Sequence, residues 1–197
     1  MTTGPQEADR LHPGNRAEWR AWLAEHHGGG GVWLVLRRPS SGRTGLSYEE
    51  AVQEALCFGW IDGKSASLDD QRTMLRFSPR KRGSGWARTN KVRIERLLAE
   101  GLMAEPGLAL IEEAKRDGSW TMLDAVEDLI VPDDLAAAFD DHPGAREQWD
   151  GLPRSVRRAA LEWIVQAKRP ETRARRVTET ARLAARGERP GPGGSGA

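Results

Sequence analysis

The chain has 197 residues and a formal net charge of +1, with 38% hydrophobic and 30% charged residues. A chain of this length fits one domain with an adequate core. Its mean hydropathy is negative, and its longest apolar runs, such as residues 32–36, are far below the roughly 20 residues of a membrane span. These features exclude a membrane-spanning protein. They predict a flexible N-terminus (1–10), a single domain (11–186) and a disordered Gly/Pro-rich tail (187–197).

The first helix is expected over residues 15–25, where Trp19, Trp22 and Leu23 form an apolar stripe. Residues 32–36 predict a buried strand, and residues 39–45 a loop. Ser47 and Glu50 have the spacing of a capping box. Apolar residues at helical spacing follow from 48 to 56, so a second helix is expected there, ending at glycine 59.

Two alternating runs, 60–65 and 72–78, predict a hairpin with a turn at 68–71. Strict alternation assigns one face to the core and leaves the other mixed in charge and aromatic character. The expected core face is Ile61, Thr73, Leu75 and Phe77. The expected mixed face is Trp60, Asp62, Lys64, Arg72, Met74 and Arg76. Pro79 ends the second strand because it cannot donate to the ladder.

The rest of the chain is expected to be helical. Helices are predicted over 84–101, 106–117, 132–140 and 153–168, and a final arginine-rich helix from residue 170. The order of elements predicts an α+β fold, with a small antiparallel sheet packed by helices and a helical C-terminal half.

Charge is segregated along the chain. Residues 72–93 hold eight basic residues and no acid, and residues 168–189 hold eight basic residues against three acids. The remainder carries 14 basic and 26 acidic residues. Two positive segments in an acidic body predict a local anion site more than general affinity for nucleic acid, which is an unlikely partner.

Four motifs in this order resemble the YdeI/OmpD-associated, or bacteriocin-protection, family. They are EALCFGWIDG (54–63), RFSPRK (76–81), Trp86 with Asn90, and AKRPETR (167–173). The resemblance covers roughly residues 11–189. It implies a small bacterial cytoplasmic protein associated with tolerance of cationic antimicrobial peptides or bacteriocins. One departure is Arg82, which stands where the family's pattern leads us to expect proline.

The main candidate site is the loop 78–85. Arg80 and Lys81 offer charge-assisted donors, and Ser84 is expected to cap the following helix, whose N-terminus would attract an anion. The full set of candidate ligand-binding residues is Trp60, Asp62, Arg76, Ser78, Arg80, Lys81, Trp86 and Asn90. Asp62 and Arg76, expected on one hairpin face, would form a polar floor beside Trp60. The alternative is a solvated loop and a structural ion pair.

Three functions follow from these residues. The first is binding of a small anionic or amphipathic ligand without turnover. The second is an enzyme using Asp62 as acid or base, and the third is nucleic-acid binding. No cofactor or metal is expected, because the four histidines lack ligand spacing. Cys57 is the only cysteine and is expected to be buried packing rather than a nucleophile. It excludes an internal disulfide, and the N-terminus lacks the apolar core of a secretory signal, so a cytoplasmic location is expected.

Overall fold

The computed structural model describes residues 10–38 and 45–191. These residues divide into two compact units, one made of 1–84 with 89–117 and the other of 85–88 with 118–197. The expected flexible N-terminus and the loop 39–45 lie almost entirely outside the described residues, as do residues 192–197 of the expected disordered tail. Residues 187–191 are described, and the Glu188 N–H donates to the Leu183 carbonyl at 3.0 Å. The single-domain organisation stays a prediction. Within the described residues no helix is long and apolar enough to cross a membrane.

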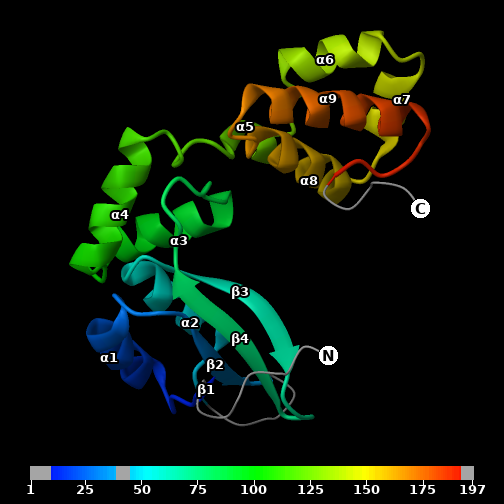
Figure 1. Ribbon diagram of the computed structural model, residues 1–197. Coiled ribbons are helices and arrows are strands. Elements are labelled where there is room, and N and C mark those ends of the chain that lie inside the picture. Colours follow the sequence, from blue (N-terminus) through cyan, green and yellow to red (C-terminus); the bar gives the residue numbers. More distant parts are fainter. Residues whose placement is uncertain (1–9, 39–44, 192–197) are drawn as a thin grey trace. The chain divides into compact units, whose positions relative to one another are not determined.

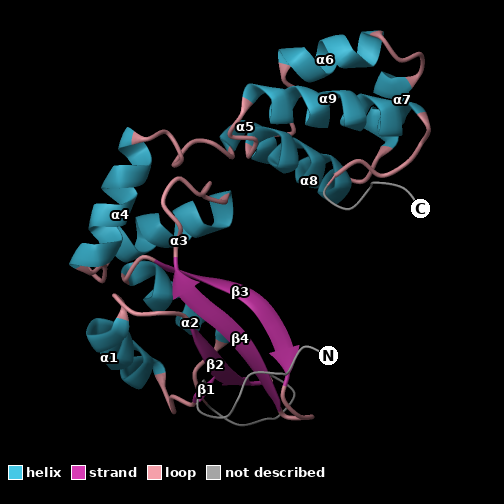
Figure 2. Ribbon diagram, viewed as in Figure 1, coloured by secondary structure: helices cyan, strands magenta, loops and turns pink. Residues whose placement is uncertain are grey.

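The first unit contains a four-stranded mixed sheet in the order β1-β2-β4-β3 (Figure 2). The strands are β1 (Arg10–Leu11), β2 (Val32–Arg37), β3 (Trp60–Ser67) and β4 (Arg72–Pro79). The pairs β2–β4 and β3–β4 are antiparallel, as expected for the hairpin. The two-residue β1 pairs parallel to β2, which makes the sheet mixed. β1 is too short to show a periodic pattern in the sequence.

Two helices cover one face of this sheet. The apolar stripe of α1 (Arg16–His26) buries Trp19 against Phe77 of β4, with ring centroids 5.5 Å apart. The capping box at the start of α2 (Tyr48–Cys57) is confirmed. The Ser47 side chain accepts a hydrogen bond from the Glu50 backbone N–H, and the Glu50 side chain accepts one from the Ser47 backbone N–H. Gly59, with a φ of +75°, follows α2, and this left-handed conformation suits glycine.

A β-bulge in β3 changes the predicted faces of the hairpin. Ser65 lies opposite Leu75, but Asp62 lies opposite Phe77, so one extra residue of β3 is accommodated between them. The bulge moves Asp62 and Trp60 onto the core face with Phe77 and turns Ile61 to the other side. The expectation that Asp62 and Arg76 share a face is therefore wrong, as is the core assignment of Ile61, which is only half-buried.

The helix expected from Ser84 begins later. The structure has α3 at Arg88–Ala99, followed in the first unit by α4 (Glu105–Arg116). Residues 85–87 form no regular element, and Gly85 packs so closely on Leu123 that an added Cβ would lie 2.7 Å from its Cγ. The predicted helix N-terminus at Ser84 is therefore wrong, because the segment before Arg88 packs as a loop.

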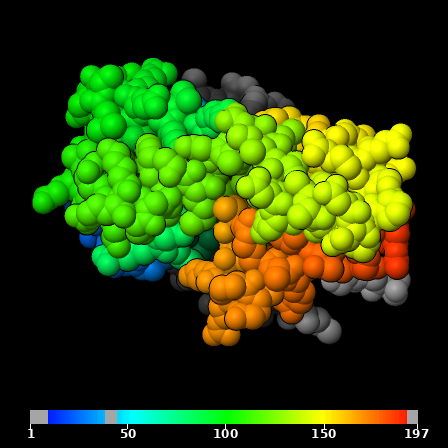
Figure 3. All heavy atoms as spheres, turned by 90° about the horizontal axis from the view of Figure 1, so that it is seen from above, coloured from blue at the N-terminus to red at the C-terminus, as the bar shows by residue number. Residues whose placement is uncertain are grey.

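The second unit is all helical (Figure 1), and its residues from 133 onward are the yellow, orange and red spheres of Figure 3. It contains α5 (Asp124–Glu127), α6 (Asp133–Asp140), α7 (Ala145–Gly151), α8 (Arg154–Val165) and α9 (Pro170–Ala185). Their buried faces form one apolar core that includes Leu135, Trp149, Ile164 and Ala181. The short helices α5 and α7 were not predicted, because a helix of one or two turns is too short to show a periodic apolar pattern. The α+β class and the helical C-terminal half are confirmed.

Candidate functional site

A polar cluster in the first unit gathers three of the predicted site residues. We call it the Arg80 site and define it as Tyr48, Asp62, Arg80, Asn90 and Arg93. These residues come from the start of α2, the start of β3, the loop after β4, and α3. The bulge in β3 is what turns Asp62 towards this side of the sheet.

Tyr48 and Asp62 form the first contact of the Arg80 site. The Tyr48 hydroxyl donates to Asp62 Oδ2 at 3.0 Å. Burial raises the pKa of Tyr48, and the nearby negative charge of Asp62 raises it further, whereas Arg93 opposes the shift. The phenol stays protonated at neutral pH and can therefore donate this hydrogen bond.

Arg80 brings a largely desolvated guanidinium to the site. Burial lowers its pKa to about 10, and the charge of Asp62 only partly offsets that effect. The loop holds the residue through its backbone, because the Arg80 N–H donates to the Gly59 carbonyl at 3.0 Å. The Asp62 carboxylate attracts this cation, and Arg80 Nη2 donates to the Ser84 hydroxyl at 3.5 Å.

Asn90 and Arg93 form the third side of the site, on one face of α3. Arg93 donates to both carboxylate oxygens of Glu49, at 2.9 and 2.7 Å, and to Asn90 Oδ1 at 3.0 Å. These bonds lower the pKa of Glu49. Arg93 and Glu49 thus satisfy each other, and Arg93 positions the Asn90 amide beside them.

The remaining candidates lie elsewhere. Trp60 is fully buried, and its indole N–H donates to the His27 carbonyl at 2.8 Å, so it belongs to the core. Arg76 and Ser78 lie on the opposite face of the hairpin, across from Trp33 and Ile61 respectively. Neither can complete the polar floor that the sequence predicted beside Asp62.

The candidates in and after the loop 78–85 also lie apart from the Arg80 site, except Arg80 itself. The Lys81 side chain is exposed, while its carbonyl accepts from the Ser84 hydroxyl at 2.6 Å. Ser84 therefore closes the loop on itself instead of capping a helix. Trp86 is buried in the second unit, where its ring lies 5.1 Å from that of Trp120. An anion site built on a helix starting at Ser84 is not supported by this geometry.

A buried glutamate on α2 was not among the predicted site residues. Glu54 is 2% exposed and accepts from Arg16 Nε at 2.5 Å and from Arg20 Nη1 at 2.7 Å. Burial raises the pKa of the neighbouring Cys57 thiol, which is fully buried. The signal was present, because Glu54 lies three residues after Ala51 on the buried side of the helix. Among the described residues, no group of three or more His, Cys, Asp or Glu side chains could hold a metal ion.

The basic C-terminal segment contacts acidic groups of its own unit. Arg173 donates to both carboxylate oxygens of Asp134, at 2.7 and 3.0 Å. Arg176 donates to the Trp163 carbonyl, and its guanidinium lies 5.0 Å from the ring centroid of the same residue. Both arginines thus hold α9 to neighbouring helices of the second unit.

Tyr48 allows a direct test of the electrostatics, because it is the only tyrosine in the chain. We expect tyrosinate absorbance to titrate above the usual pKa of about 10. Asp62→Asn should lower this pKa by removing a negative charge, and Arg93→Gln should raise it by removing a positive one. Since the folded-state pKa is the higher one, Tyr48 contributes stability that is lost as pH rises through it. Equal titrations in all three proteins would contradict the arrangement.

Two parts of the chain each match a known protein family. The protein has an α+β fold with a partly buried polar site in its first unit, and residues 11–110 match the family described as Domain of unknown function (DUF8412). The chain belongs to that family. Residues 128–187 match the family described as Bacteriocin-protection, YdeI or OmpD-Associated.

The second match confirms the resemblance found in the sequence and contains the AKRPETR motif. The motifs at 54–63 and 76–81 and the Trp86/Asn90 pair lie within the first match instead. Residues 128–187 are thus similar to the bacteriocin-protection family, and this match covers less than half of the chain. No curated protein and no solved structure matches it.

Proposed function

We propose that the protein binds a small amphipathic carboxylate at the Arg80 site. The observation that carries the proposal is the grouping of the Arg80 guanidinium with the Asp62 carboxylate and the half-exposed Tyr48, whose hydroxyl donates to Asp62 Oδ2 at 3.0 Å. A ligand carboxylate has the planar geometry that a guanidinium binds in two hydrogen bonds.

The surroundings of Arg80 favour a ligand with both a charged and an apolar part. The Tyr48 ring is 48% exposed and offers an apolar surface beside the cation. Glu49 is already held by Arg93 through both oxygens, so it does not compete for Arg80.

Binding without turnover is the function we favour. A second proposal, acid–base catalysis by Asp62, is supported by its hydrogen bond with Tyr48, because a phenol and a carboxylate in contact can pass a proton. A ligand of this kind would connect the protein to bacteriocin tolerance as an intracellular binder. The proposed cytoplasmic location is supported by the lone buried thiol of Cys57.

The binding proposal is best tested with fluorotyrosine. Because Tyr48 is the only tyrosine, biosynthetic labelling gives a single fluorine resonance inside the site. We expect benzoate and octanoate to shift this resonance in a saturable manner. Arg80→Met should weaken binding by about tenfold or more, since a charge-assisted pair contributes about 1.5–3 kcal/mol.

Lys81→Met is the matched control, because it removes the same charge from the neighbouring exposed residue. It should change the affinity for benzoate only slightly. Arg80→Met should also leave the melting temperature nearly unchanged, because methionine keeps most of the apolar stem of the arginine. Equal loss in both variants, or normal binding in Arg80→Met, would contradict the proposal. Survival of bacteria expressing each variant under bacteriocin challenge would then connect binding to tolerance.

A further inference from the structure

Three basic side chains meet on the face of the sheet opposite Asp62. Arg37 at the end of β2 lies directly across from Arg72 at the start of β4. His12 follows Leu11, which pairs with Leu34, so it comes alongside Val35 on the same face. Three neighbouring strands thus bring three basic residues to one edge, although they are far apart in the sequence.

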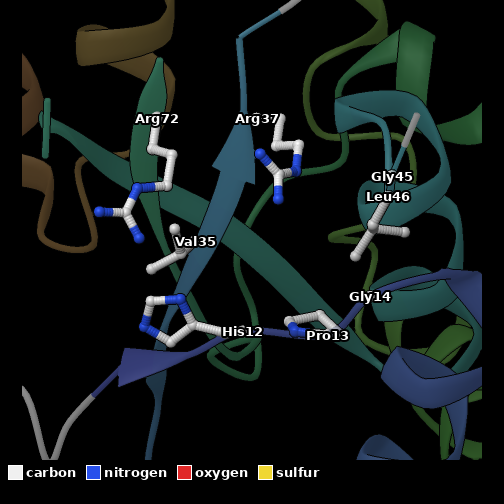
Figure 4. Close-up of a pocket in the computed structure, with 8 residues that line it drawn as sticks. All are labelled: His12, Pro13, Gly14, Val35, Arg37, Gly45, Leu46 and Arg72. Carbon is white, nitrogen blue, oxygen red and sulfur yellow. The ribbon is translucent and has the colours of Figure 1, made fainter. Parts of the chain in front are cut away.

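These residues line a cavity of about 200 Å³. Figure 4 shows the His12 ring and the two guanidinium groups arranged around Val35. The apolar part of the wall includes Val35 and Leu46, both buried. No carboxylate belongs to the described lining. The cavity is therefore concave, partly apolar at its wall and positively charged.

The pairing of Arg37 with Arg72 is unfavourable by itself, because like charges directly opposite one another on antiparallel strands repel. Asp69 compensates one of them, since its Oδ2 accepts from Arg72 Nε at 2.7 Å. Among the described residues Arg37 has no such carboxylate partner. A bound anion between the two guanidinium groups would remove the repulsion.

A second hollow continues from the first. It has a volume of about 440 Å³ and is lined by Arg37, Asp69, Asp70, Gln71 and Arg72. The two arginines belong to both hollows and separate a cationic side from a side with two carboxylates and an amide. Carboxylates and amides accept hydrogen bonds from hydroxyl groups, so this side suits a hydroxylated, uncharged molecular body.

We propose that this edge of the sheet binds a hydroxylated phosphate monoester. The phosphate occupies the cavity of His12, Arg37 and Arg72, where paired guanidiniums match its oxygens. The polyol part extends over Asp69 and Asp70. The site is separate from the Arg80 site. Phe77 and Asp62 point to one face of the hairpin, whereas Arg72 points to the other face.

The test is calorimetric titration of the full chain with glycerol phosphate, inorganic phosphate and glycerol. Glycerol phosphate should bind more tightly than inorganic phosphate, and glycerol alone should not bind detectably. Arg37→Gln should weaken glycerol phosphate by about tenfold, as expected for loss of one charge-assisted pair. Asp70→Ala should weaken glycerol phosphate relative to inorganic phosphate, because it removes an acceptor for the hydroxyl groups while the cationic cavity stays the same.

Arg38→Gln is the matched control. Arg38 is the adjacent arginine, but its guanidinium is held by Ser67 Oγ at 2.9 Å and by the Asp69 carbonyl at 3.4 Å, and it is not among the described residues that line either hollow. Equal weakening by Arg37→Gln and Arg38→Gln would show general charge attraction and overturn the proposal. Equal affinity for inorganic phosphate and glycerol phosphate would overturn the polyol assignment.

The two sites can fail independently. Glycerol phosphate should leave the fluorotyrosine resonance of Tyr48 unshifted, and Arg80→Met should retain glycerol phosphate binding. Loss of glycerol phosphate binding in Arg80→Met would overturn the second site, because the ligand would then occupy the Arg80 site.

Discussion

Replacing Phe77 by alanine is expected to lower the free energy of unfolding by about 3–5 kcal/mol, the range for truncated buried aromatic side chains. Phe77 has no exposed surface and packs edge-on against Trp19. It lies at the point where α1 contacts the sheet, so the cavity left by its ring cannot collapse easily. Chemical denaturation of the wild type and the variant measures the difference.

Ile61→Ala is the matched comparison for Phe77→Ala. The bulge places Ile61 on the opposite face, where it is half-buried, so its truncation should be clearly less destabilising. A Phe77→Ala loss below about 1 kcal/mol would mean that the ring is not part of a tightly packed core. A larger loss at Ile61 than at Phe77 would mean that β3 has no bulge and alternates strictly.

The second large effect concerns the buried carboxylate of Glu54. The double variant Arg16→Ala/Arg20→Ala should lose about 3–5 kcal/mol, because it leaves a buried charge without its partners. Both arginines are about one-third exposed, at 34% and 36%, whereas Glu54 is 2% exposed. Water can therefore replace Glu54 around the arginines but cannot reach Glu54 itself.

Adding Glu54→Leu to the double variant tests this explanation. The triple variant removes the stranded charge and should recover most of the lost stability, because apolar groups of similar volume replace buried ion pairs with little loss. Denaturation of all three proteins measures the recovery. If the triple variant is as unstable as the double variant, the arginines contribute through packing, such as the contact of Arg20 with the Phe58 ring.

Much of the fold could be predicted because local patterns determine it. The capping box at Ser47 and Glu50 fixed the start of α2, and the apolar stripe around Trp19 identified α1. The bulge could not be predicted, since nothing in the run from Trp60 to Ser67 distinguishes strict alternation from one extra residue. The late start of α3 depends on the packing of Gly85 against Leu123, a contact between distant residues.

The site was predictable in part for the same reason. Asp62, Arg80 and Asn90 were identified from motifs, and they belong to the polar cluster. Tyr48 and Arg93 were missed because each appeared to be an ordinary residue of its helix. The cavity at Arg37 and Arg72 was missed because it depends on which residues of β2 and β4 lie opposite each other, a register that neither strand specifies by itself.

The bulge in β3 also affects how related sequences are aligned. Consider a relative that lacks one residue between Asp62 and Ser65. In that relative, every residue of β3 before the gap would point to the opposite face of the sheet. Such a gap would remove the aspartate from its tyrosine even when both letters are retained in the alignment. Relatives with the same spacing from this aspartate to the following turn are therefore the ones expected to share the chemistry of the site.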